Sequence, residues 1–110
     1  MLAALVAVTP VTHAKIITVD HPLGSTRVTS QPERVVVLGM DALDILDFLQ
    51  IEPIGIVKAP IPDYLIQYDS AKYQSVGTLH DPDFETIYSL KPDLIIASSR
   101  SSNAYDELSK

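Results

Sequence analysis

The sequence contains no cysteine and no tryptophan, and only four glycines in 110 residues. Without cysteine the chain has no disulfide framework, no thiolate metal site and no cysteine nucleophile. Basic residues are also few, since 8 Lys and Arg stand against 14 Asp and Glu and give a formal net charge of −6. Phosphate contacts need clustered Lys and Arg, and no such run is present, so the composition argues against a nucleic-acid partner.

Catalytic and cofactor motifs are missing as well. No G-x-S-x-G elbow surrounds a serine, no H-E-x-x-H is present, and the VLGMD turn lacks the G-x-G-x-x-G of dinucleotide sites. The three histidines form a poor set of metal ligands: His13, His21 and His80. We therefore expect no catalytic residues, no cofactor and no direct metal coordination.

The first apolar stretch, LAALVAVT at residues 2–9, is too short to span a bilayer. It looks like the hydrophobic core of a secretory signal that lacks its basic start, with Thr12 and Ala14 before a cleavage point at Lys15. We interpret residues 1–14 as a signal-peptide remnant and predict export to a periplasm, with a buried N-terminal strand as the alternative. No cysteine follows the run, so we expect no lipid anchor.

Residues 15–110 suffice for one small domain, and an apolar content of 46% supplies a core. Two β-rich stretches around a His-Pro-Leu-Gly turn predict a hairpin, Lys15–Asp20 with Ser25–Thr29. Apolar runs then alternate with helical patterns, which predicts an α/β fold with a Rossmann-like parallel sheet flanked by helices. The expected strands are 35–39, 54–58, 75–78 and 94–97, and the expected helices are 41–50, 62–68, 82–91 and one starting at 104.

The stretch from Asp81 to Arg100 is the centre of this pattern. Asp81 is expected to cap a helix whose first position is Pro82, because proline lacks the N–H that would go unpaired there. Pro92 ends that helix. The apolar run LIIA at 94–97 predicts a parallel strand covered on both faces, and a polar turn follows it.

The expected helix 41–50 carries an aspartate at every third position. We interpret these side chains as a solvated stripe rather than a metal site, with the first serving the helix N-terminus: Asp41, Asp44 and Asp47. Apolar residues at helical spacing are expected to face inward, namely Ala42, Leu43, Ile45, Leu46 and Leu49.

Three segments of the chain resemble, in this order, class III substrate-binding proteins of bacterial ABC importers, which bind iron–siderophores and cobalamin. The segments are ERVVVLGMDALDILDFLQIEPIGIVK, YQSVGTLHDPDFE and ETIYSLKPDLIIASSR. The resemblance covers residues 15–110 and looks closest to the branch that binds catecholate-type ferric siderophores. It implies a periplasmic binding protein whose two lobes hold the ligand and dock onto a permease in the inner membrane. Residues 15–110 would be a truncated N-terminal lobe of a protein that is monomeric at full length.

Open parallel sheets bind ligands at the carboxyl ends of their strands, and Arg100 lies just past such an end. A guanidinium can both hydrogen-bond and stack on a ferric catecholate. The alternative is a surface arginine paired with Asp106 or Glu107. The resemblance implies that a basic residue in this turn contacts the ligand, so we predict ligand contacts from Arg100 and from the adjacent Ser99.

Three further residues are candidates. His80 follows a predicted extended piece, at a position where some relatives carry a lysine. Tyr64 belongs to a trio with Tyr68 and Tyr73 that either lines a pocket for an aromatic ligand or packs a short helix. The resemblance implies that Glu85 docks onto permease arginines, whereas plain helix-start electrostatics is the alternative.

Two other functions remain open at this stage. The same fold could bind a different cargo, such as cobalamin, haem or a metal ion. The chain could also be a small intracellular α/β enzyme or regulatory domain, a class that secretion of the protein would exclude.

Overall fold

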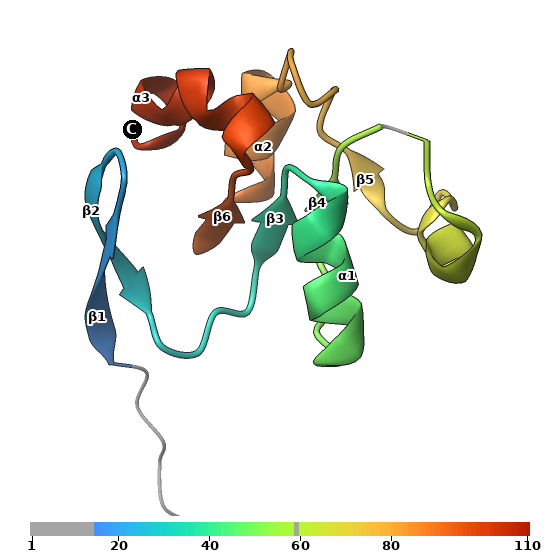
Figure 1. Cartoon of the computed structure of the whole chain (residues 1–110), viewed down its shortest axis with the longest axis horizontal. Coiled ribbons are helices and arrows are strands. Elements are labelled where there is room, and N and C mark those ends of the chain that lie inside the picture. Colours follow the sequence, from blue (N-terminus) through green and yellow to red (C-terminus); the bar gives the residue numbers. More distant parts are fainter. Residues whose placement is uncertain (1–14, 59) are drawn as a thin grey trace, which may run out of the picture.

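A computed structural model describes residues 15–58 and 60–110, with only the backbone described at Ser99, Arg100 and Ser102. The expected signal-peptide remnant, residues 1–14, lies outside the described residues. The described chain forms an antiparallel hairpin and a separate four-stranded parallel sheet with helices around it (Figure 1). The α/β fold predicted from the sequence, with the hairpin first, is confirmed.

The hairpin pairs β1 (Ile16–His21) with β2 (Gly24–Thr29) at the predicted place. It is joined to the C-terminal end of the chain by the His21 and Tyr105 rings, which meet edge to face with centroids 5.1 Å apart. His21 Nε2 also lies 2.7 Å from Thr26 Oγ1, and the Tyr105 hydroxyl lies 3.2 Å from that oxygen. A small polar cluster therefore links the hairpin to the domain.

The parallel sheet has the strand order β5-β4-β3-β6, and all its pairs are parallel. Its strands are shorter than the sequence predicts: β3 (Val35–Val37), β4 (Gly55–Ile56), β5 (Gln74–Ser75) and β6 (Leu94–Ile96). The prediction that 94–97 is covered on both faces is wrong in part. The three residues of β6 are only half-buried, because β6 is an edge strand of this sheet.

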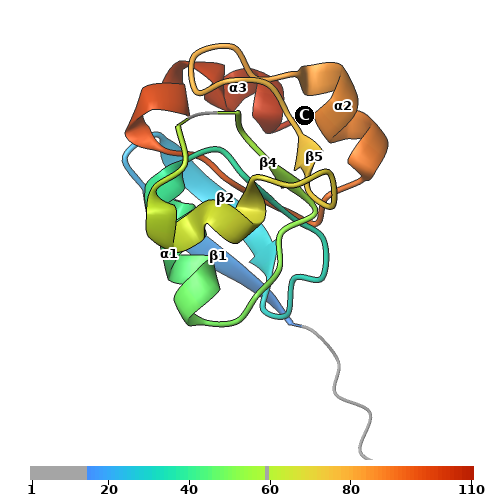
Figure 2. The same cartoon turned by 90° about the vertical axis from the view of Figure 1, so that its right-hand side faces the viewer.

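A helical segment follows each parallel strand. Helix α1 (Met40–Phe48) and the 3-10 helix η1 (Asp63–Tyr68) lie on one side of the sheet, and α2 (Phe84–Leu90) lies on the other (Figure 2). The chain closes with the 3-10 helix η2 (Ser99–Ala104) and α3 (Tyr105–Leu108). Among the described helices, none is both long enough and apolar enough to cross a membrane.

Alternate residues of β3 supply both halves of the core. Val35 and Val37 pack with the buried residues of α1 and η1. Val36 and Leu38 point the other way and pack with Ile87 of α2. Because successive side chains of a strand point to opposite faces, one strand of three residues holds both helical layers together.

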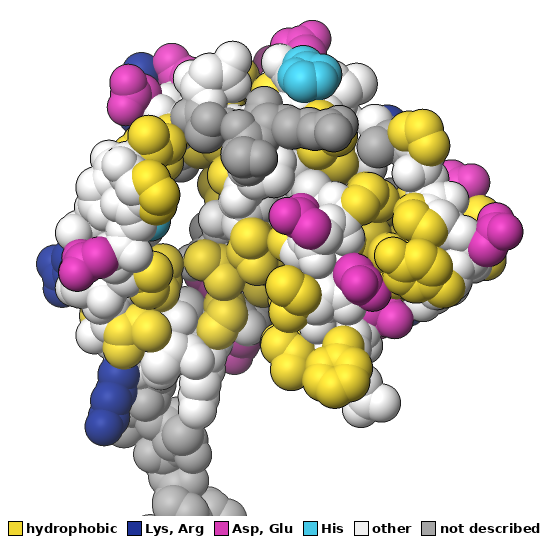
Figure 3. All heavy atoms as spheres, viewed as in Figure 1, with side chains coloured by type: hydrophobic (Ala, Val, Ile, Leu, Met, Phe, Trp, Pro, Cys, Tyr) yellow, Lys and Arg dark blue, Asp and Glu magenta, His cyan; other side chains and the backbone are white. Residues whose placement is uncertain are grey.

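The predicted inward face of α1 is only partly correct. Leu43 and Leu46 are buried, whereas Ile45 and Leu49 are 60% and 55% exposed, and Phe48 is 85% exposed. Figure 3 shows the hydrophobic side chains gathered over α1 and η1 on this side of the molecule. The sheet beneath α1 is short, so the helix covers it with a narrow stripe and leaves its outer apolar residues in solvent.

The prediction that the aspartates of α1 form a solvated stripe is wrong for Asp47. Its Oδ1 accepts hydrogen bonds from the Tyr68 hydroxyl at 2.8 Å and from Gln67 Nε2 at 3.0 Å. Burial, and then this carboxylate, raises the pKa of Tyr68 to about 12. Tyr68 also packs on Tyr73, with ring centroids 4.9 Å apart, so these two tyrosines attach η1 to the domain as the packing interpretation predicts.

The start of α2 is displaced from its predicted place. Asp83, not Asp81, is the N-cap, and its carboxylate accepts from the Thr86 N–H at 3.1 Å and the Thr86 hydroxyl at 2.7 Å. These hydrogen bonds lower the pKa of Asp83. The helix starts late because Pro82 pairs with Gly77 in an isolated antiparallel bridge, which turns the chain before the helix can begin.

Candidate ligand-binding edge

The carboxyl ends of the four parallel strands meet at one edge of the sheet, the upper edge in Figure 1. We call this the carboxyl edge and define it by the residues two positions beyond the end of each strand: Gly39, Lys58, Gly77 and Ser98. Ligands of open parallel sheets bind in this position, where strands end and helices begin.

The polar turn after β6 is held by its own serines. Ser101 is fully buried, and its hydroxyl accepts from the Ser98 N–H at 2.9 Å and donates to the Ser98 carbonyl at 3.2 Å. The Ser101 N–H bonds to that carbonyl at 3.1 Å. This buried serine is a structural residue that the sequence analysis missed, because one serine among four in SSRSS carries no mark of its own.

The same turn is attached to the end of β3. The Ser98 hydroxyl lies 3.4 Å from the Leu38 carbonyl oxygen, and the Leu38 N–H donates to the Ile96 carbonyl at 2.8 Å. A side chain at Gly39 would place its Cβ 3.0 Å from Ser98 Cβ and 2.6 Å from Asp41 Oδ1. Glycine at this position therefore leaves room for the close approach of these two strand ends.

Ser99 and Arg100 begin η2 directly beyond this anchored turn. Their side chains lie outside the described atoms, so their ligand contacts stay a prediction. One competing partner of Arg100 is engaged elsewhere, since Glu107 forms an ion pair with Lys110 at 3.0 Å. The backbone position of Arg100, past the end of β6, is the one that the sequence predicts.

His80 lies at the other end of the carboxyl edge, in the loop between β5 and α2. The loop is closed by the Gly77–Pro82 bridge and by hydrogen bonds of 3.1 Å in both directions between Thr78 and Asp81. Gly77 has φ +94°, and a Cβ there would meet the Asp81 carbonyl oxygen at 2.5 Å. His80 is exposed on this tight loop.

The loop of His80 and the backbone of Arg100 lie beyond the same edge of the sheet. β5 and β6 are the two outer strands, with β4 and β3 between them. Three interstrand steps of about 4.8 Å each place the ends of β5 and β6 about 14 Å apart.

Lys58 is a candidate that the sequence analysis missed. It follows β4, one of the two central strands, and its N–H donates to the Gly77 carbonyl at 2.6 Å. Its side chain is exposed, and the ion pairs found among the described residues do not include it. Lys58 ends the run IGIVK, so it is a basic residue just past an apolar run, as Arg100 is.

Tyr64 lies on η1, which packs beside α1 rather than across the carboxyl edge (Figure 1). Its side chain is 65% exposed. A ligand contact from Tyr64 stays a prediction. Among the described residues, no three His, Asp or Glu side chains are grouped so that they could hold a metal ion.

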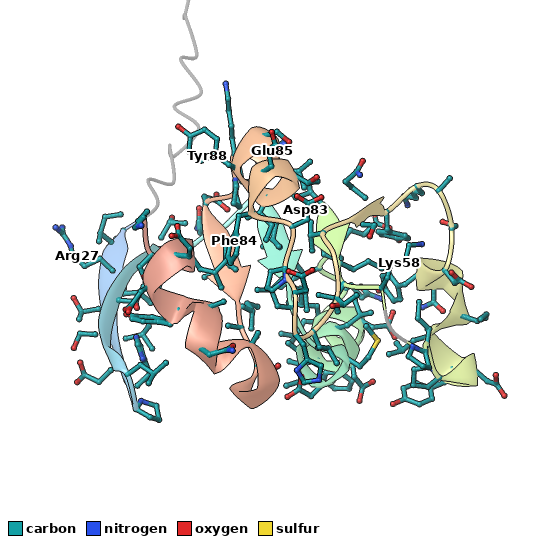
Figure 4. The ribbon with its side chains drawn as sticks, turned by 90° about the horizontal axis from the view of Figure 1, so that it is seen from above. Arg27, Lys58, Asp83, Phe84, Glu85 and Tyr88 are labelled. Carbon is teal, nitrogen blue, oxygen red and sulfur yellow. The ribbon has the colours of Figure 1, made fainter. Side chains whose placement is uncertain are left out.

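Glu85 lies in the first turn of α2 and is exposed. Seen from above the carboxyl edge, Glu85 and Tyr88 point outward from α2, away from the sheet (Figure 4). The outer face of α2, to which Glu85 and Tyr88 belong, is thus turned away from the sheet.

No protein-family model matches the chain. The petrobactin-binding protein YclQ of Bacillus subtilis is 44% identical over 98 residues, which cover 86% of this chain and 31% of the relative. The solved periplasmic catecholate-siderophore binding protein VctP from Vibrio cholerae is 51% identical with a TM-score of 0.83, over 86% of this chain and 34% of that protein. The chain belongs to the family of siderophore-binding proteins.

A third member of the family adds a bound ligand. The siderophore-binding protein BauB, solved with a complex between two molecules of acinetobactin and ferric iron, is 42% identical with a TM-score of 0.80, over 86% of this chain and 34% of that protein. The chain spans about one third of the length of the family members it matches. Two more of them, both from Bacillus subtilis, are named as lipoproteins.

Proposed function

We propose that residues 15–110 form part of the N-terminal lobe of a two-lobed substrate-binding protein, monomeric at full length, that carries a ferric siderophore to an ABC importer. The observation that carries this proposal is the similarity to VctP, 51% identical, which is named for catecholate siderophores. A ligand of catecholate type is therefore the first choice. The role is binding rather than catalysis, as in the named relatives.

The carboxyl edge suits such a ligand. A ferric catecholate complex is a bulky anion with aromatic faces, whereas the chain has a net charge of −6. A local cation is needed to hold an anion on such a protein. Lys58 and Arg100 follow the ends of β4 and β6, and Ser99 lies beside Arg100. His80 and Tyr64 complete the set of proposed ligand contacts.

The proposed partner on the other surface is the permease of the importer. Glu85 is proposed as the docking carboxylate of this lobe, because it is exposed and its side chain points away from the sheet. A rim charge of this kind steers association more than it adds affinity.

The proposed location is the periplasm, as stated in the name of VctP. Relatives named as lipoproteins support the coarser statement that the protein works outside the cytoplasmic membrane, soluble or anchored.

A fluorescence-quenching titration of the two-lobed protein tests the function. Ferric catecholates, ferric hydroxamates, ferric citrate, haem and cobalamin would be compared at equal concentration. We expect the tightest binding for a ferric catecholate. If the protein bound only haem or cobalamin tightly, that ligand and not a siderophore would be its cargo. If it bound none of these ligands, a transport role would be contradicted.

A further inference from the structure

Tyr88 has an aromatic side chain that lies mostly in solvent instead of packing against the domain. It is 84% exposed on α2, and the hydrogen bonds of the described residues include none to its hydroxyl. Other tyrosines are engaged, since the hydroxyls of Tyr68, Tyr73 and Tyr105 each meet a polar partner. A large exposed aromatic ring is a common anchor of protein interfaces.

Glu85 lies three positions before Tyr88, so both side chains lie on one face of α2. Figure 4 shows both pointing outward. Of the nearby charged groups, Asp83 is occupied by Thr86, and Lys91 follows the last turn in a left-handed conformation. The face therefore presents a carboxylate beside an unoccupied aromatic ring.

The chain itself shows what such a pair binds. At the Glu52 site, Lys72 Nζ lies 2.8 Å from the Glu52 carboxylate and 5.3 Å from the centre of the Tyr73 ring. One cation there satisfies a carboxylate and a tyrosine together. Glu85 and Tyr88 offer the same two groups, and neither takes part in the ion pairs and cation–π contacts found in the part of the chain that the structure describes.

We propose that Glu85 and Tyr88 together bind one arginine guanidinium of the permease, with the carboxylate as ion-pair partner and the Tyr88 ring as stacking surface. Guanidinium suits this pair better than ammonium, because its flat, weakly hydrated face stacks on an aromatic ring while its edge bonds a carboxylate. The inference rests on the proposed function and adds Tyr88 to the docking surface. It identifies the ring as the source of affinity and the carboxylate as the source of orientation.

The test is the affinity of the two-lobed, siderophore-loaded protein for its permease complex in lipid nanodiscs. Tyr88→Ala is expected to weaken binding about five- to thirtyfold, the range of a desolvated cation–π contact. Tyr88→Phe should retain most of the affinity because it keeps the ring, and Tyr88→Leu should not. Phe48→Ala is the matched control, since Phe48 is 85% exposed on α1 and should leave docking unchanged.

Siderophore affinity, measured by fluorescence quenching, should be the same in all these variants. A wild-type affinity for the permease in Tyr88→Ala, with Glu85→Ala impaired, would overturn the stacking role and leave the proposed function intact. Equal loss in Tyr88→Ala and Phe48→Ala would also overturn it, because the effect would then be general apolar contact. If the wild-type protein bound no siderophore, the proposed function itself would fail.

Discussion

The guanidinium of Arg34 donates to the carbonyl oxygen of Leu90, at 2.9 Å from Nε and 2.6 Å from Nη2. Leu90 ends α2, so the cation lies where the free carbonyls of a helix concentrate negative partial charge. In the opposite direction, the Asp93 carboxylate accepts the N–H groups of Glu33 and Arg34, both at 2.8 Å. The linker before β3 and the turn after α2 thus hold each other.

Asp93→Ala is expected to lower the free energy of unfolding by about 1–3 kcal/mol, because two backbone N–H groups lose a charged acceptor. Urea unfolding followed by circular dichroism measures this. Asp44→Ala is the matched control, an exposed aspartate of α1 that should change stability by less than about 0.5 kcal/mol. Equal effects of the two substitutions would contradict the role of Asp93.

Gly77→Ala is expected to destabilise the domain more than Gly24→Ala, by at least about 1 kcal/mol. Both glycines have positive φ, +94° and +141°, so both substitutions strain the backbone. Only at Gly77 would the new Cβ meet backbone atoms within 2.6 Å, whereas the nearest atom at Gly24 lies 3.9 Å away. Thermal unfolding of the two variants decides this, and a larger loss in Gly24→Ala would refute the packing of the His80 loop.

Stability should fall as the pH rises from about 10 to 12 because of Tyr68, whose pKa is raised to about 12. In that window the unfolded tyrosine has lost its proton and the folded one keeps it, so deprotonation favours the unfolded state. Below pH 10 the contribution of Tyr68 is fully present. Tyr68→Phe should be less stable at pH 8 by about 1.5–3 kcal/mol, through loss of the bond to Asp47, and should show a flatter alkaline limb in urea unfolding. An identical pH dependence in both proteins would rule out Tyr68 as its origin.

In the two-lobed protein, Arg100→Ala is expected to lose about 1.5–3 kcal/mol of binding to an anionic ferric catecholate. Arg100→Lys should recover part of it, because a point charge cannot reproduce the planar fork. Lys58→Ala should also weaken binding, and its loss should shrink as salt is added. Arg27→Ala, on the hairpin and far from Lys58 in Figure 4, removes the same charge as a control. If Arg100→Ala bound the ferric catecholate with wild-type affinity, Arg100 would be a surface arginine without a role in ligand binding.

The 110-residue chain alone should bind the siderophore weakly, because a ligand held from one side keeps much of its surface in water. Isothermal titration with the chain and with the two-lobed protein compares them directly. The exposed face of α1 and η1 should also make the chain self-associate, visible by light scattering. Sub-micromolar binding by a monodisperse chain would contradict this expectation.

Periodicity located the secondary structure because the apolar runs are short and well separated. The run VVV supplies both faces of the sheet, and its alternation fixes where α1 and α2 pack. The lengths were overestimated, since apolar residues such as Leu38 and Val57 are buried just beyond the ends of β3 and β4. A hydrophobic pattern reports burial and not strand pairing.

The structural features that the sequence did not predict are of two kinds. Some are contacts between residues far apart in the chain. In others, one of several neighbouring residues of the same type takes a role that all of them could take. Asp47 meets Tyr68 only after η1 folds back on α1, so no local pattern marks it. Asp81 and Asp83 are equally good caps by sequence, and the Gly77–Pro82 bridge selects the second. Ser101 belongs to a run of serines, and its burial is seen only in the folded structure.

The strand order has a consequence for ligand choice. Lys58 follows the end of β4 and Arg100 follows the end of β6, and both strands pair with β3 between them. The spacing of these two strand ends is therefore set by backbone hydrogen bonds, and it cannot change without breaking the strand pairing. A change of cargo charge, in contrast, needs only a new side chain at Lys58 or Arg100.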